Sequence, residues 1–122
     1  MASNEPILVV DDDDALRETL TDLLQLEGYR VVSASNGREA LDLLERSPRP
    51  CAMILDMMMP VMSGWELLDV VKHDSHLSSI PVTVVSATCD FAPLADEIVK
   101  KPIRVDALLH AVARCCARNP VD

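Results

Sequence analysis

Residues 7–28, ILVVDDDDALRETLTDLLQLEG, decide the fold. They open on a continuous apolar run, residues 7–10, whose length and β-branched content are typical of a buried strand. An acidic stretch follows, and leucines then recur at positions 16, 20, 23 and 24, which is the spacing of one helix face. Gly28 stands where a helix in this register would end. The stretch therefore predicts a buried strand followed by an amphipathic helix.

The same alternation of apolar run and helical pattern repeats along the chain. Further strands are expected at residues 30–34, 51–55, 82–85 and 98–99. Further helices are expected after Asn36, over residues 65–72 and from residue 105 toward residue 118. Because the runs are continuous rather than alternating, the strands should be covered on both faces. The order predicts a single α/β domain with a parallel sheet wrapped by helices, its core over about residues 5–118.

Composition excludes several classes of function. The net charge of −9 argues against binding nucleic acid as the main task, because the phosphate backbone is anionic. No apolar run approaches the roughly 18 residues of a membrane span. The first residues lack the basic and apolar segments of a secretory signal. We therefore expect a cytoplasmic protein with no direct nucleic-acid binding and no membrane attachment.

The four cysteines, Cys51, Cys89, Cys115 and Cys116, include no C-x-x-C pair. A zinc site or a disulfide framework is accordingly less favoured than reduced thiols packed inside a cytosolic protein.

Charged and polar side chains stand where four of the predicted strands end. Residues 11–14 are all aspartate, Asp56 ends the third strand, Ser86 the fourth, and Lys101 follows the fifth. Parallel strands bring their carboxyl ends to one crevice, so these groups should meet. Crowded carboxylates repel unless a cation intervenes, and Mg²⁺ accepts one or two carboxylates while keeping waters for a phosphate oxygen. A carboxylate nucleophile with a nearby lysine and hydroxyl suits phosphoryl transfer.

Each of these features also has an ordinary explanation. The four-aspartate run taken alone fits a solvated turn equally well. It also resembles the start of a calcium loop, but an EF-hand spaces its ligands around a glycine, whereas a helix begins here at once. Asp56 alone fits a turn cap, and Lys101 fits plain surface. The coincidence of four strand ends favours the crevice.

Four stretches in this order resemble the receiver domains of two-component response regulators. They are ILVVDDDDALRETL (7–20), ILDMMMPVMSG (54–64), IPVTVVSA (80–87) and VKKPI (99–103), and the likeness spans essentially the whole chain. The resemblance implies a doubly wound, flavodoxin-like or CheY-like sheet of five parallel strands in the order 2-1-3-4-5, flanked by helices.

The resemblance also implies a Mg²⁺ site. Asp12 and Asp56 would bind the ion directly, together with the backbone carbonyl of Met58. Asp11 would act mainly through water.

The implied reaction moves a phosphoryl group from a sensor histidine kinase or a histidine phosphotransfer protein to Asp56. Lys101 would neutralise charge on the phosphoryl oxygens, and hydrolysis would reset the state. The domain catalyses part of this itself, yet it is a signalling module more than a conventional turnover enzyme. Contacts with the histidine-bearing partner are implied at Leu16, Arg17 and Pro102.

The sequence departs from the family in two places. The family usually carries an aromatic residue three positions before the lysine, coupled to the switch hydroxyl that Ser86 matches; here that position is Ile98. The interval from Ser86 to Lys101 is also shorter than usual. We therefore expect the fourth family helix, over residues 88–96, to be short, absent or disordered.

Met58 and Thr88 occupy positions at which the family tunes the lifetime of the phosphoryl group. A thioether orients an attacking water poorly, which suggests a phosphoryl state that is not especially short-lived; the alternative is that Met58 merely packs.

Two other functions stay open. A pseudo-receiver would keep the fold as a phosphorylation-independent protein-binding module. A haloacid-dehalogenase-like phosphatase would need a second aspartate at position 58, where this chain has methionine. The sequence leaves open the cognate kinase, the output partner, the oligomeric state, and whether the chain stands alone or belongs to a larger regulator.

Overall fold

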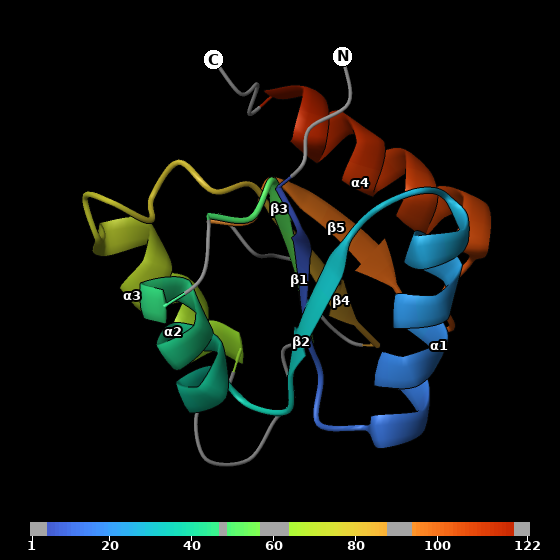
Figure 1. The fold of residues 1–122 in the computed structure, drawn as a ribbon, viewed down its shortest axis with the longest axis horizontal. Helices are drawn as coiled ribbons and strands as arrows, with labels where there is room; N and C mark the ends of the chain where they lie inside the picture. Colours follow the sequence, from blue (N-terminus) through green and yellow to red (C-terminus); the bar gives the residue numbers. More distant parts are fainter. Residues whose placement is uncertain (1–4, 47–48, 57–63, 88–93, 119–122) are drawn as a thin grey trace.

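A five-stranded parallel sheet forms the centre of the molecule (Figure 1). The computed structural model describes residues 5–46, 49–56, 64–87 and 94–118. Its strand order, β2-β1-β3-β4-β5, confirms the predicted doubly wound arrangement. The strands are β1 (Ile7–Val10), β2 (Val31–Ala34), β3 (Ala52–Asp56), β4 (Val82–Ser86) and β5 (Glu97–Lys100). The described helices are α1 (Asp14–Leu26), α2 (Gly37–Arg46), α3 (Gly64–His73) and α4 (Val105–Arg118).

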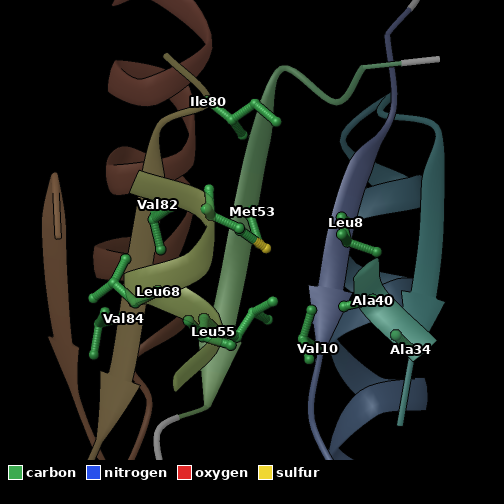
Figure 2. Packing of buried hydrophobic residues seen from close by; sticks show 12 residues of the cluster. Leu8, Val10, Ala34, Ala40, Met53, Leu55, Leu68, Ile80, Val82 and Val84 are labelled. Carbon is green, nitrogen blue, oxygen red and sulfur yellow. The ribbon is translucent and has the colours of Figure 1, made fainter. Parts of the chain in front are cut away.

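Helices cover both faces of the sheet, as the continuous apolar runs predict. α2 and α3 pack on one face, where alternate residues of β1, β3 and β4 meet Ala40 and Leu68 (Figure 2). α1 and α4 pack on the other face, against Val9 and Ile54 among others (Figure 1). No helix in the described part of the chain is both long and apolar enough to cross a membrane.

The connection between β4 and β5 is short. Its described residues, 87 and 94–96, form no helix, in line with the shortened fourth family helix, and residues 88–93 lie outside the described part. Asp96 joins this connection to the start of β4, because its carboxylate accepts from the Val82 N–H at 2.7 Å. The Lys72 ammonium at the end of α3 contacts the same carboxylate oxygen at 3.0 Å. These bonds fix the point at which the chain enters β5.

The cysteines differ from the expectation of reduced thiols. Cys51 and Cys116 form a disulfide between the residue before β3 and the last turns of α4, with Cα atoms 5.0 Å apart. The prediction is therefore wrong for this pair. The prediction rests on short spacings such as C-x-x-C. These two cysteines are 65 positions apart and meet only because α4 crosses the amino end of β3. Cys115 is buried and takes no part in this disulfide, and Cys89 lies outside the described residues.

Candidate functional site

The acidic loop, residues 11–14, leads from β1 into α1. The Asp11 N–H donates to the Ala34 carbonyl of β2 at 3.1 Å, so Asp11 continues the strand pairing. Asp13 caps the helix, since its side chain accepts from the Leu16 N–H at 3.1 Å. Asp14 is the first residue of α1, and its charge is favoured at this positive end of the helix. Asp11, Asp13 and Asp14 thus occupy three different structural positions.

The structure brings Asp11, Asp12 and Asp56 together. Each offers a carboxylate oxygen, and these oxygens all lie within 4.8 Å of one another, a set we call the acid cluster. Asp11 and Asp56 are buried, whereas Asp12 is exposed. Hard oxygen donors at this separation fit a divalent cation such as Mg²⁺, with its remaining positions open to water or phosphate oxygens.

The pKa of Asp11 is raised within the acid cluster. Burial raises the pKa of Asp11 to about 6, against the hydrogen bond from the Asp13 N–H at 2.9 Å, which lowers it. The charge of Asp56 and a hydrogen bond with its carboxyl also contribute to this raised pKa, while Lys101 acts to lower it. The raised pKa shows that a negative charge on Asp11 is disfavoured in this environment, so added positive charge is favoured there.

Lys101 supplies positive charge beside the acid cluster. Its ammonium lies 3.4 Å from the Asp56 carboxylate, which is 3% exposed. The Lys101 N–H donates to the Ser86 carbonyl at 3.1 Å, which holds the residue at the end of β5 beside β4. The peptide bond between Lys101 and Pro102 is cis. The structure therefore places Lys101 against Asp56.

Ser86 is the last residue of β4 and is buried. Its neighbour Val85 is paired with Asp56 in the parallel register, so Ser86 lies one residue further toward the carboxyl edge than Asp56. Ile98, in the outer strand β5, is 43% exposed. Met58 and Thr88 lie outside the described residues, and the lifetime roles predicted for them stay predictions.

One contact at the site was not anticipated. The Arg17 guanidinium donates to the Asp11 carbonyl at 2.8 Å and pairs with the Asp14 carboxylate. The spacing of Asp14 and Arg17, three apart on a helix, signals the ion pair in the sequence. The bond to the Asp11 main chain has no such signal.

Comparison with known proteins identifies the type of domain. The family model described as the response regulator receiver domain matches residues 7–113. Response regulator MprA of Mycolicibacterium vanbaalenii is 37% identical over 95% of this chain and 52% of its own length. Transcriptional regulatory protein AfsQ1 of Streptomyces coelicolor is 32% identical over 95% of this chain and 54% of its own. The chain therefore spans about half the length of these curated relatives.

Solved structures agree with the sequence comparison. The receiver domain of a signal transduction histidine kinase from Syntrophus aciditrophicus has a TM-score of 0.84 and 31% identity, covering 93% of this chain and 90% of that one. The chemotaxis protein CheY4 of Vibrio cholerae has a TM-score of 0.82 and 29% identity, covering 93% and 99%.

Proposed function

The chain belongs to the response regulator receiver domain family, and from this premise we propose that it accepts a phosphoryl group on Asp56 within a two-component phosphorelay. The observation that carries the proposal is the Lys101 ammonium at 3.4 Å from a buried Asp56 that shares an acid cluster with Asp11 and Asp12. A nucleophilic carboxylate between a cation site and a lysine is what phosphoryl transfer requires.

The acid cluster is the proposed Mg²⁺ site. Receiver domains generally bind Mg²⁺ at an acidic pocket, and the three carboxylates here fit that ion. Asp12 and Asp56 would contact it directly with the Met58 carbonyl, and Asp11 mainly through water. When bound, Mg²⁺ supplies positive charge that offsets the charge on the phosphoryl oxygens.

The chain's own residues perform the remaining steps. An Asp56 carboxylate oxygen attacks phosphorus, a P–O bond forms, and the P–N bond of the donor phosphohistidine breaks with its electron pair left on the imidazole. Lys101, already beside Asp56, pairs with a phosphoryl oxygen as charge develops there. The Ser86 hydroxyl donates to another phosphoryl oxygen and acts as the switch. Water later attacks phosphorus, releasing phosphate and restoring the carboxylate.

The partner that supplies the phosphoryl group is a histidine kinase or a histidine phosphotransfer protein, as for receiver domains in general. One relative is named a transcriptional regulatory protein, and this chain spans about half of that relative. The predictions of no direct nucleic-acid binding, no membrane attachment and a cytoplasmic location therefore concern the present domain and stay predictions.

A pseudo-receiver is the second candidate. It is favoured by Ile98, which stands where the family usually has an aromatic residue and is 43% exposed on the outer strand. A binding module of this kind would keep the fold and the surface without using Asp56 chemically.

Labelling by a small phosphodonor separates the two candidates. The wild-type chain and Asp56→Asn are incubated with acetyl phosphate, with Mg²⁺ or with a chelator. If the chain is a phosphoacceptor, wild type incorporates phosphate in the presence of Mg²⁺, and neither Asp56→Asn nor chelated wild type does. Wild type that binds Mg²⁺ but takes up no phosphate would establish the pseudo-receiver instead.

A further inference from the structure

Arg17 forms a bridge inside the acidic loop. One guanidinium nitrogen, Nη1, donates to the Asp11 carbonyl at 2.8 Å, and the other, Nη2, pairs with Asp14. The side chain is only 19% exposed, so it lies along the protein rather than in solvent. The planar guanidinium holds two acceptors in a fixed geometry, which a lysine ammonium does not.

The orientation of the Asp11 carbonyl affects the position of the next residue, Asp12. This oxygen lies in the same planar peptide unit as the Asp12 Cα. A hydrogen bond that fixes the orientation of the oxygen therefore also fixes the position of the Asp12 Cα. The other side of Asp11 is already held, because its N–H donates to Ala34 and its carboxylate accepts from the Asp13 N–H. The bond from Arg17 completes this set of restraints on the loop that carries two of the three acids.

We infer that Arg17 is a positioning residue for the proposed Mg²⁺ site, holding the Asp11 carbonyl so that Asp12 points into the acid cluster. The inference rests on the proposed function for the identity of the ion. It assigns Arg17 a task inside the domain, distinct from the contact with a partner that the family resemblance implies. Arg17 contacts the main chain of Asp11 rather than its carboxylate, so we assign its effect on the site to the Asp11 carbonyl.

The direction in which Mg²⁺ affinity changes when Arg17 is replaced distinguishes a positioning role from a purely electrostatic one. A guanidinium near a cation site repels the cation, so a purely electrostatic Arg17 would weaken Mg²⁺ binding, and its removal would strengthen that binding. If Arg17 instead holds the loop in shape, its removal weakens binding. The two roles therefore predict opposite changes.

The test is calorimetric titration of the full chain with Mg²⁺ alone. Arg17→Met, which keeps the length and loses the donors, should weaken Mg²⁺ binding about 10-fold, since a charge-assisted hydrogen bond is lost. Arg17→Lys should restore part of the affinity. Asp14→Asn is the matched control, because it removes the ion pair and leaves the Asp11 bond; its affinity should stay within about twofold of wild type.

Amide exchange gives a readout that needs no metal. The Asp13 N–H, which donates to the Asp11 carboxylate, should exchange faster in Arg17→Met than in wild type, while amides of β3 keep their rates. Unchanged or tighter Mg²⁺ binding by Arg17→Met, with wild type binding normally, overturns the inference alone. Failure of wild type to bind Mg²⁺ overturns both the inference and the proposed site.

Discussion

The two ends of β3 are built differently. At the amino end, Cys51 is buried and covalently joined to α4. At the carboxyl end, the buried Asp56 faces Asp11, Asp12 and the Lys101 ammonium. One end gathers apolar contacts and a cross-link, and the other gathers charges that repel or attract one another.

This difference implies that stability and chemistry are separable along one strand. β3 has five residues, which at about 3.3 Å per residue places its ends on the order of 13–16 Å apart. Effects of mutations further apart than about 10 Å are usually additive. Loss of the restraint at the amino end should therefore lower the free energy of unfolding and leave phosphorylation intact, whereas the charged groups at the carboxyl end should affect phosphorylation independently of that restraint.

The largest expected effect is at the amino end. Cys116→Ser opens a disulfide that closes a loop of 65 residues, and the loss of this restraint should lower the free energy of unfolding by about 4 kcal/mol. Urea denaturation followed through Trp65 fluorescence measures it, and reduction of wild type should reproduce the shift. Loss of phosphorylation in a variant that is still folded would break the separation of the two ends.

At the carboxyl end, Lys101→Ala should slow labelling of Asp56 by about 100-fold, or about 2.7 kcal/mol, because one charge that stabilises the transferring group is removed. Labelling rates with a small phosphodonor measure this, and the neighbouring Lys100→Ala is the control that should label at nearly the wild-type rate. Equal slowing in both variants would mean that general positive charge, rather than the 3.4 Å contact of Lys101, is responsible.

The pH dependence of stability should also originate at the carboxyl end. Burial raises the pKa of Asp11 from 3.8 to about 6, so its favourable contribution is fully present below pH 3.8 and is lost as pH rises through about 6. In metal-free protein the loss should be on the order of 2 kcal/mol. Denaturation of wild type and Asp11→Asn between pH 4 and 7 measures this loss, because carboxyl groups that do not interact with Asp11 cancel in the difference. A difference independent of pH would contradict this origin.

The smallest expected effect tests the helix cap in the acidic loop. Asp13→Ala removes the acceptor for the Leu16 N–H and should lower the free energy of unfolding by about 1 kcal/mol. Asp13→Asn keeps a capping oxygen and should stay close to wild type. A large loss of Mg²⁺ binding in Asp13→Ala alone would show that cap and metal site are less separate than their positions indicate.

The sheet could be predicted because its signal is local. Continuous apolar runs such as residues 7–10 and 52–55 identify strands covered on both faces, and the strand order followed from the family motifs. The grouping of charged and polar residues at the carboxyl edge could also be predicted, because parallel strands bring their carboxyl ends to the same edge of the sheet. Asp56, Lys101 and Ser86 all lie at that edge in the structure.

Three features could not be predicted from the sequence, because each depends on contacts that form only in the folded chain. Cys51 and Cys116 meet through tertiary packing, and no spacing rule connects them. The family resemblance assigned Asp11 and Asp12 to the metal site, but the role of Asp13 as the helix cap became evident only from the backbone geometry. The bond from Arg17 to the Asp11 carbonyl is a side-chain to main-chain contact, which leaves no periodic pattern.

Chemical trapping of the phosphorylated residue tests the central claim most directly. After incubation with acetyl phosphate and Mg²⁺, borohydride reduces an aspartyl phosphate to homoserine, and peptide mass spectrometry locates it. We predict homoserine at position 56 alone, and none when the ion is chelated. Homoserine within residues 11–14, or none at position 56 in protein shown to bind Mg²⁺, would contradict the assignment of Asp56 as the phosphoacceptor.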